Sequence, residues 1–361
     1  MDKIKKPTFI VNKSKVISNT LSILKKIAAS EGTVRFRPHF KTHQSVQVSE
    51  WLKPLGITSI TVSSLDMALL FSQHGWNDIS VAILVNPLQI DQINFLAERI
   101  HLSLLVDSKT TALWLEKELK HPVNVWIKID TGYHRTGIEW SSKEEILSLS
   151  RAIANASKLN LKGLLTHSGH SYHADTTDDI ESIYLDTVSK MKHVKQTLLE
   201  NNIKDIQISL GDTPTCSIMK SFNGIDEIRC GNFVYYDVQH LMLGVIEESQ
   251  IAAALACPVI GIYPMRNEIV IYGGAVHLSK DRAIDWEGRD IYGLVAPPLN
   301  TEYQWGSVLE KTYVKSLSQE HGVIKTTPQV IEKIKTGDLL MILPPHACLT
   351  ANLMKENTLY C

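Results

Sequence analysis

The chain has 361 residues, of which 44% are hydrophobic and 21% charged, and its formal net charge is −1. This length is more than one hydrophobic core usually serves, so we expect one large domain and a smaller one. The near-neutral charge, with no basic stripe and no acidic tail, excludes proteins that bind nucleic acid through a basic face or carry an acidic solvating segment.

The sequence offers no recognisable signal for export or membrane insertion. Basic residues near the N-terminus are not followed by an apolar segment, which excludes a signal peptide. The longest apolar run, Ile251–Tyr263, is too short to span a bilayer. Five cysteines without regular spacing indicate reduced thiols or a ligand rather than a disulfide framework. We therefore expect a cytoplasmic protein with no membrane partner.

Short apolar runs alternate with longer amphipathic stretches over about the first 240 residues. Eight strand–helix units in succession are typical of a (β/α)8 barrel. The alternative is a doubly wound open sheet, which normally has fewer strands and often a glycine-rich turn after the first. The eight runs are Val34–Lys41, Ile57–Ser64, Ile79–Pro87, His101–Ser108, Val123–Gly132, Leu159–Gly169, Asp205–Pro214 and Glu227–Tyr236.

Two stretches between the runs show a helical period, with apolar residues recurring at spacings of three and four. The clearer one has Ile180, Tyr184, Thr187, Met191, Val194 and Leu198 on one face. The other, near the N-terminus, places Ile17, Leu21, Leu24 and Ala28 on one face.

The pattern changes from about residue 248, where short strand-like runs are separated by turn residues. Such runs are Glu268–Val276, Ile291–Ala296 and Asp338–Leu343. We predict a barrel domain over residues 1–247 and a mostly β domain over residues 248–361. The first residues of the chain are candidates for joining the β domain.

Lys41 ends the first run and lies between His39 and His43. The site of such a barrel lies at the carboxyl ends of its strands. We expect a lysine there to be partly buried, and burial and nearby positive charge favour the neutral amine that forms a Schiff base. On position alone, a lysine that makes a salt bridge at the barrel rim fits equally well.

The turns after the seventh and eighth runs are candidates for binding phosphate, as in many barrels. Thr213 and Thr215 offer hydroxyls, and the backbone at Gly231 and Asn232 can approach a ligand closely. Asp212 is awkward beside a phosphate, so it is expected to point away or to cap the following helix. Each turn alone also fits an ordinary strand-to-helix connection.

The ends of the fifth and sixth runs carry residues that could contact a planar cofactor. Arg135 could hydrogen-bond an anionic oxygen. His167, His170 and Tyr172 lie together and could stack on a ring or hydrogen-bond to it. A rim ion pair for Arg135 and structural roles for the histidines are the alternatives.

His346 and Cys348 stand two positions apart near the C-terminus. In an extended segment, residues with this spacing point to the same side, and imidazole with thiolate suits zinc. Two protein ligands leave coordination positions for water and substrate, as a catalytic metal requires. A buried cysteine beside a structural histidine is the alternative.

The segment Arg37–His43 resembles the lysine motif of the D-serine dehydratase and D-threonine aldolase group. These are fold-type III enzymes of pyridoxal 5'-phosphate (PLP) and relatives of alanine racemase. Further motifs of this group follow in order along nearly the whole chain. They lie at His167–Tyr172, Gly211–Thr215, Gly231–Asp237, Ser318–Gly322 and Pro345–Thr350.

The resemblance implies an α/β fold, a (β/α)8 TIM barrel with a C-terminal mostly β domain, and usually a homodimer. It implies that Lys41 carries PLP as a Schiff base and takes the α-proton of the substrate. Arg135 matches an arginine near the cofactor ring, and His346 and Cys348 match the metal pair. The other cofactor contacts are Tyr172, Thr215, Gly231 and Asn232 from the resemblance, with His167 and Thr213 from the residues themselves.

The second metal ligand separates the two reactions of the group. D-serine dehydratases resemble this chain in having His-x-Cys and bind zinc, whereas D-threonine aldolases more often have His-x-Asp, which suits manganese or another hard ion. Cys348 therefore favours a zinc-dependent D-serine dehydratase, which forms pyruvate and ammonia by β-elimination. A D-threonine aldolase, or another lyase of D-3-hydroxy amino acids, is the alternative.

Two remote alternatives belong to other classes of protein. One is a non-catalytic PLP-binding protein of a related small barrel family, which lacks the β domain. The other is a PLP-free metallohydrolase that would use His39, His43, His167 and His170.

Overall fold

A computed structural model of the chain describes residues 4–299 and 303–361. The described residues divide into two compact units. The barrel unit comprises Ser22–Lys41 and Leu52–Gly231. The β unit comprises the described residues up to Leu21, Thr42–Trp51 and the chain from Asn232 onward. The domain boundary after residue 247 stays a prediction.

The described part of the barrel unit contains eight parallel strands in the order β2-β10-β9-β8-β6-β5-β4-β3. A parallel bridge between His39 and Thr61 joins the two ends of this order, with Phe40 N donating to Thr61 O at 2.8 Å. The sheet is therefore a closed barrel, which excludes the open sheet and confirms the predicted fold class. The strands are β2 (Arg35–Phe36), β3 (Ile60–Val62), β4 (Asp78–Leu84), β5 (His101–Val106), β6 (Val123–Asp130), β8 (Leu159–Leu165), β9 (Gln207–Leu210) and β10 (Glu227–Ile228), with β7 (Ile138–Glu139) beside β6.

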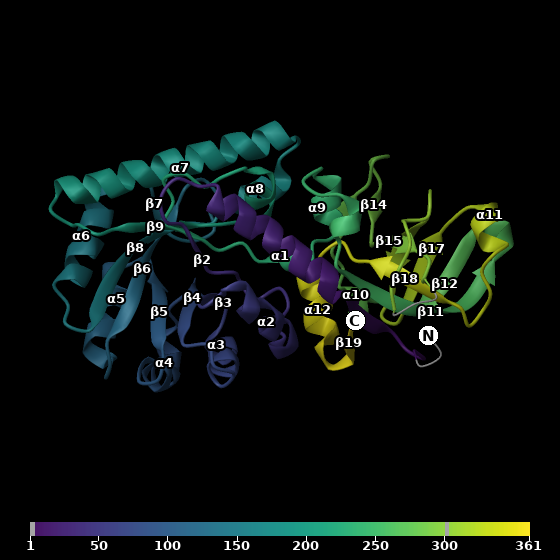
Figure 1. Cartoon of the computed structure of the whole chain (residues 1–361), viewed down its shortest axis with the longest axis horizontal. Coiled ribbons are helices and arrows are strands. Elements are labelled where there is room, and N and C mark those ends of the chain that lie inside the picture. Colours follow the sequence, from purple (N-terminus) through teal and green to yellow (C-terminus); the bar gives the residue numbers. More distant parts are fainter. Residues whose placement is uncertain (1–3, 300–302) are drawn as a thin grey trace. The chain divides into compact units, whose positions relative to one another are not determined.

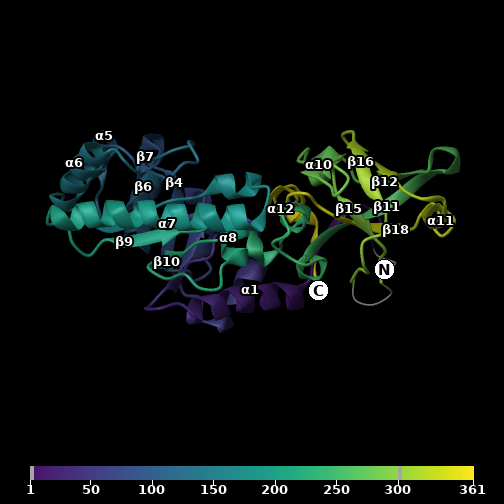
Figure 2. The same cartoon turned by 90° about the horizontal axis from the view of Figure 1, so that it is seen from above.

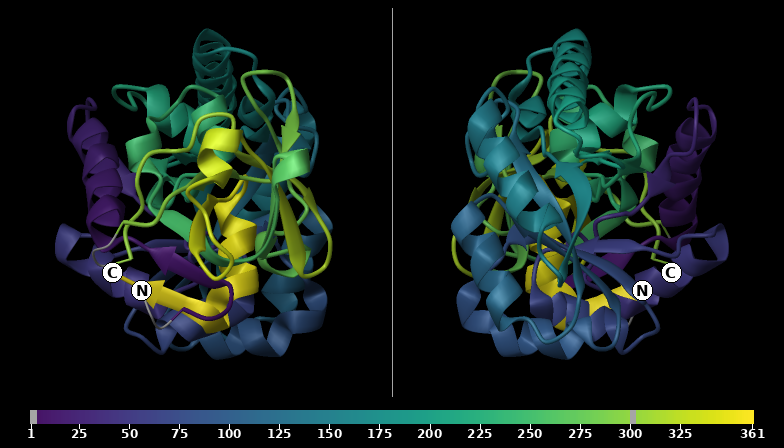
Figure 3. Two further views of the ribbon diagram at one scale, coloured as in Figure 1. Left: turned by 90° about the vertical axis from the view of Figure 1, so that its right-hand side faces the viewer. Right: turned by 90° about the vertical axis from the view of Figure 1, so that its left-hand side faces the viewer.

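Helices follow most of these strands and surround them, as the right-hand view of Figure 3 shows. The longest, α7, is the teal helix of Figures 1 and 2. It begins with a capping box in which Thr176 and Asp179 satisfy each other's backbone N–H groups. The helices are α1 (Lys13–Ala28), α2 (Val46–Leu52), α3 (Leu65–Ser72), α4 (Ile90–Ala97), α5 (Lys109–Glu118), α6 (Lys143–Ala154), α7 (Thr177–Glu200) and α8 (Thr213–Ile218), of which α1 and α2 are shared between the units.

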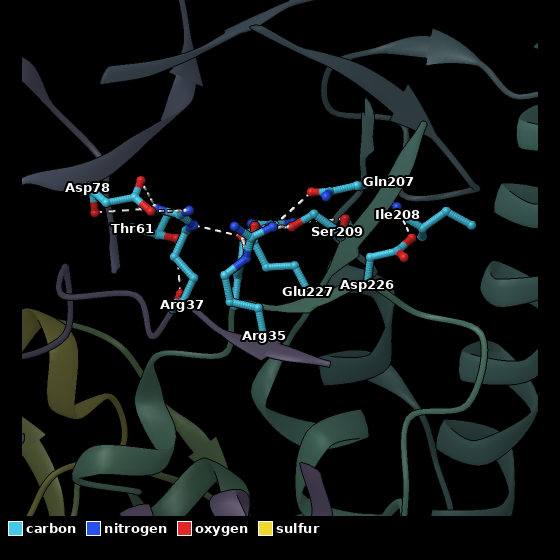
Figure 4. Close-up of polar contacts among 10 residues, drawn as sticks. Arg35, Arg37, Thr61, Asp78, Gln207, Ile208, Ser209, Asp226 and Glu227 are labelled. Atoms are coloured by element: carbon cyan, nitrogen blue, oxygen red, sulfur yellow. Dashed lines mark hydrogen bonds and ion pairs between the residues drawn. The ribbon is translucent and has the colours of Figure 1, made fainter. Parts of the chain in front are cut away.

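A buried ion network holds the first and last barrel strands together (Figure 4). Glu227 on β10 is fully buried and accepts hydrogen bonds from Arg37 Nε and from Ser209 Oγ, each at 2.7 Å. Arg37 also pairs with Asp78 on β4 at 2.7 Å. Since a buried charge without a partner is strongly destabilising, these groups depend on one another. The network fixes the strand that leads to Lys41.

The β unit contains, among its described residues, a closed ring of antiparallel strands in the order β11-β12-β17-β16-β15-β18. It is visible in the left-hand view of Figure 3. β1, near the N-terminus, pairs with β11 and with the C-terminal β19, so the start of the chain joins this unit. The strands are β1 (Thr8–Val11), β11 (Ala253–Tyr263), β12 (Glu268–Tyr272), β15 (Leu294–Ala296), β16 (Tyr313–Leu317), β17 (His321–Lys325), β18 (Leu339–Leu343) and β19 (Thr358–Tyr360), with the hairpin β13 (Ala283–Ile284) and β14 (Asp290–Ile291).

Four short helices lie between or after these strands. They are α9 (Val238–Met242), α10 (Ala275–Leu278), α11 (Pro328–Ile331) and α12 (Ala347–Met354). Within the described ranges, none of the helices of the chain is both long enough and apolar enough to cross a membrane.

Candidate functional site

Lys41 follows the residues that close the barrel. The last backbone bond of this segment to the barrel wall is made by Phe40, so the chain leaves the wall at Lys41. Its side chain is exposed, and the expectation that it is partly buried is therefore wrong. Its backbone N–H donates to His39 Nδ1 at 3.3 Å, which orients the neighbouring imidazole.

The carboxyl ends of the barrel strands carry a concentration of positive charge around His167. Burial, together with the charges of Lys41 and Arg135, holds the pKa of His167 well below its usual value. The imidazole is therefore neutral, and its Nδ1 lies 3.3 Å from the Gly211 carbonyl oxygen. The structure thus brings three predicted residues, Lys41, Arg135 and His167, into one electrostatic environment, which favours an anionic ligand.

Tyr133, which was not predicted as a site residue, contacts two of the predicted cofactor residues. Its ring packs edge-on against His167, with ring centroids 5.7 Å apart. The Arg135 guanidinium lies 4.9 Å from the centre of the same ring. Its position could have indicated a role, because Tyr133 lies in the same turn as Arg135, which was already a candidate for binding the cofactor.

Asp212 caps the helix that follows β9, which is one of its two expected positions. Its carboxylate accepts from Thr215 N at 3.0 Å, from Thr215 Oγ1 at 2.9 Å and from Ser171 Oγ at 2.7 Å. Burial raises its pKa, although these hydrogen bonds oppose the shift. Both hydrogen-bond donors of Thr215 are thus directed to Asp212. Thr213, the residue after Asp212, is buried at the first position of α8.

The remaining predicted cofactor residues lie in turns of both units. Tyr172 is half-buried in the 3-10 helix Gly169–His173, which follows β8. Gly231 is buried at the end of the barrel unit. Asn232 is buried in the β unit, and its Nδ2 donates to Asp237 at 2.5 Å.

Lys128 is a buried lysine that the sequence reasoning missed. It lies on β6 and is 5% exposed, and its Nζ donates to the Ile129 carbonyl oxygen at 3.0 Å. Burial, and then the charge of Arg229, lower its pKa to about 7. A lysine between two isoleucines in a predicted inner strand was the signal that could have revealed it.

Replacing Lys128 by methionine should change how stability depends on pH. Between about pH 7 and the ordinary lysine value of 10.5, this amine is neutral in the folded chain and protonated in the unfolded chain. Because the unfolded state then binds more protons, raising the pH stabilises the folded state through this group. Urea denaturation gives the free energy of unfolding of each protein. The wild-type value minus the Lys128→Met value should increase as the pH is raised across this window.

Lys162→Met is the matched control for Lys128→Met, because Lys162 is an exposed lysine on the neighbouring strand β8. Its difference from wild type should not change over the same range. A flat difference for Lys128→Met as well would show that the pKa of Lys128 is not lowered in the folded protein.

His346 and Cys348 lie at the start of α12, which corrects the expected extended segment. His346 is the N-cap residue and Cys348 is the second residue of the helix. The two side chains still interact, since a hydrogen bond between them contributes to the pKa of His346.

The surroundings of His346 favour positive charge. Burial lowers its pKa, but Cys348, Asp237 and a hydrogen bond to Asp281 raise it to about 10. The Asp281 carboxylate lies 2.7 Å from His346 Nδ1. Because Nδ1 is used in this hydrogen bond, Nε2 is the ring atom that would coordinate a metal. Asp281 is a second residue that the sequence reasoning missed, because it is 65 positions away from His346 along the chain.

Cys348 also contacts the segment that begins with the residue after Lys41. Its Sγ donates to Thr42 Oγ1 at 3.3 Å, and both residues belong to the β unit. The peptide bond between Lys41 and Thr42 therefore connects the candidate lysine directly to a residue that touches the candidate metal pair.

One three-residue group in the described ranges has the spacing of metal ligands, namely Asp130, His134 and Glu139. Asp130 accepts from the backbone N–H groups of Gly132, Tyr133 and His134, so turn formation already accounts for its position. The group contains none of the histidines of the metallohydrolase alternative, so the structure gives that alternative no support.

Comparison with known proteins gives two adjoining family matches. Residues 11–239 match the N-terminal domain of alanine racemase, and residues 252–360 match a putative serine dehydratase domain. Together these matches account for almost the whole chain. They follow the same order as the barrel and the β strands described above.

Two curated relatives are each 30% identical to this chain. The D-serine dehydratase of Dictyostelium discoideum matches over 94% of this chain and 90% of its own length. The D-threo-3-hydroxyaspartate dehydratase of Delftia sp. strain HT23 matches over 88% and 84%. The solved structure of the Delftia enzyme superposes with a TM-score of 0.89 at 27% identity, covering 97% of this chain and 93% of that one. A cysteine-to-alanine mutant of it, described as metal-free, superposes equally well.

Proposed function

Since the chain belongs to the D-serine dehydratase family of alanine racemase-like proteins, we propose that it is a PLP-dependent lyase of D-serine. The reaction is a β-elimination that yields pyruvate and ammonia. The observation that carries the proposal is the contact between Cys348 and Thr42, the residue next to Lys41. Thr42 is covalently bonded to Lys41, and a base for the α-proton together with a Lewis acid at the β-hydroxyl suits β-elimination.

The residues at the barrel mouth fit an anionic cofactor. Lys41, Arg135 and the neutral ring of His167 share one positive environment. Lys41 would carry PLP, and Arg135, His167, Tyr172, Thr213, Thr215, Gly231 and Asn232 would hold it. Because Asp212 already occupies both donors of Thr215, we propose that Thr215 contributes mainly by shaping the turn. When bound, PLP accepts the electron pair left at the α-carbon.

The chain's own residues account for moving the α-proton. The exposed amine of Lys41 can reach a small substrate and take the proton from its α-carbon. The lowered pKa of His167 makes its neutral ring a weak base, so it can hydrogen-bond without taking the α-proton itself.

The donors at the start of α12 fit zinc. An imidazole and a thiol, with Asp281 orienting the imidazole, are ligands that zinc prefers. The description of the Delftia cysteine mutant as metal-free is consistent with a metal in that relative. When bound, zinc supplies a Lewis acid for the β-hydroxyl. His346 and Cys348 would hold it, and manganese would replace it if the reaction were that of an aldolase.

The family also supports two proposals about the assembly and the location of the protein. We propose a homodimer, which light scattering on the purified protein would test by its mass. We propose that the protein acts in the cytoplasm, on a free D-3-hydroxy amino acid and not on nucleic acid or a membrane.

The product of the reaction tests the proposed function directly. Purified protein is incubated with D-serine, D-threonine or D-threo-3-hydroxyaspartate, with and without a strong chelator, and the keto acid, ammonia, glycine and aldehyde are measured. We expect pyruvate and ammonia from D-serine, lost on chelation and restored by zinc. Glycine and aldehyde as the main products would establish the aldolase instead. Much faster turnover of D-threo-3-hydroxyaspartate would assign that substrate.

A further inference from the structure

Asp237 accepts more hydrogen bonds than a helix cap requires. It is the N-cap of α9, is fully buried, and accepts from His240 N at 3.2 Å and His240 Nδ1 at 2.5 Å through Oδ1. Its other oxygen, Oδ2, accepts from Asn232 Nδ2 at 2.5 Å and from Ala347 N at 3.0 Å. All three partner residues lie in the β unit.

The hydrogen bond from Ala347 N to Asp237 takes the place of a capping bond at the start of α12, which the His346 side chain does not make. His346 is the N-cap of α12, yet its side chain makes no capping hydrogen bond. An N-cap side chain normally accepts from the first turn of its own helix. Here Asp237, 110 residues earlier, accepts from that turn. The imidazole is thereby left to contact Asp281.

Two backbone bonds attach the same segment to α9. Val238 N donates to the Pro344 carbonyl oxygen at 3.0 Å, and Gln239 N donates to the Pro345 carbonyl oxygen at 3.3 Å. Asp237 and the two residues after it therefore bond to the chain on both sides of His346, at Pro344, Pro345 and Ala347. The start of α9 acts as a clamp on the turn that carries the candidate metal pair.

We propose that Asp237 is a positioning residue that fixes the metal-ligating turn against the cofactor-contacting turn at Asn232. This inference rests on the proposed function, because it takes His346 and Cys348 as ligands and Asn232 as a cofactor contact. Through Oδ2, one carboxylate oxygen sets the position of both turns. Loss of Asp237 therefore weakens metal and cofactor binding together.

The test measures binding rather than activity alone. Zinc affinity is measured by competition with a fluorescent chelator, and cofactor affinity by absorbance during titration with PLP. We expect Asp237→Asn to weaken zinc binding by roughly 10–100-fold, the usual cost of losing a residue that orients a ligand. PLP binding should also weaken, because Asn232 loses its hydrogen bond to the Asp237 carboxylate.

Asp285→Asn is the matched control. Asp285 is also a buried carboxylate of the β unit, and its hydrogen bonds are to Glu287 N, Arg289 N and Arg289 Nε, none of which belongs to the turn that carries the metal pair. Its loss should lower stability and leave both affinities unchanged. Wild-type affinities in a folded Asp237→Asn protein would overturn the inference.

Ala347→Pro decides the question if Asp237→Asn does not fold. Proline is well accepted at the first position of a helix and removes the N–H that Asp237 accepts. The backbone of His346, with φ −137° and ψ 96°, is extended and avoids the α region that a following proline disfavours. Weaker zinc binding supports the inference, and unchanged zinc binding overturns it.

His346→Ala separates failure of this inference from failure of the proposed function. If His346→Ala binds zinc as tightly as wild type, the metal pair itself is wrong. If His346→Ala loses zinc while folded Asp237→Asn keeps it, only the role of Asp237 is wrong.

Discussion

Lys41→Ala is expected to lower kcat/KM for D-serine by at least about 10³-fold, the scale of losing a group that transfers a proton and forms a covalent bond. The reason is that the variant loses both the amine that would carry PLP and the base for the α-proton. No other lysine replaces it, because Lys128 is buried and its Nζ donates to a backbone carbonyl. The barrel should fold normally, since the Lys41 side chain is exposed.

Borohydride trapping gives a readout that loss of activity alone does not. Reduction of the wild-type protein should attach one pyridoxyl group to the peptide that contains Lys41, as peptide mass mapping can show. Lys41→Ala should carry none. Lys109→Ala is the control, since Lys109 is an exposed lysine at the start of α5. Attachment at another lysine in wild type would refute the assignment.

The exposed position of Lys41 shows which part of the site could not be predicted from the sequence. A run that ends in Pro38-His39-Phe40-Lys41 predicts a strand end, and in the structure the barrel closes at His39 and Phe40. Whether the next side chain points inward depends on where the wall's hydrogen bonding stops. The last of these hydrogen bonds is made to Thr61 on β3, so the sequence around Lys41 alone cannot predict where the bonding stops.

The two predicted helical faces show a similar limit. All six residues predicted for the face of α7 are buried. The face predicted for α1 is wrong, because Leu21 is 49% exposed while Val16, Thr20 and Ile23 are buried. In α1, polar Asn19 and Thr20 are buried because Asn19 donates to the Gln250 carbonyl oxygen and Thr20 to that of Val16. Apolar spacing alone could not find a face stabilised by hydrogen bonds.

The candidate metal site was predictable as a pair of residues but not as an environment. His-x-Cys indicates soft ligands wherever it lies. Asp281 and Asp237, which raise the pKa of His346, come from distant segments and are brought there by the fold of the β unit. Asp130, His134 and Glu139 show the converse: their spacing resembles a metal site, yet the backbone bonds of a turn explain it.

Cys348→Ala is expected to remove most of the zinc and, with it, the elimination from D-serine. Imidazole alone binds zinc weakly, because the thiolate supplies both negative charge and the soft donor that zinc prefers. We expect kcat/KM to fall by about 10²-fold or more, since the Lewis acid contributes several kcal/mol at the leaving hydroxyl. Metal analysis of the purified variant, together with pyruvate formation, checks both parts.

Cys361→Ala is the matched control, because Cys361 is also half-buried in the β unit and contacts the Val11 carbonyl oxygen rather than the metal pair. It should keep its zinc and its activity.

Cys348→Asp then tests the identity of the metal: a carboxylate favours harder ions, so activity should return with manganese better than with zinc. If Cys348→Ala retains stoichiometric zinc and full turnover, the thiol is not a ligand. Its contact with Thr42 would then be structural, and the link between Lys41 and a metal would be lost.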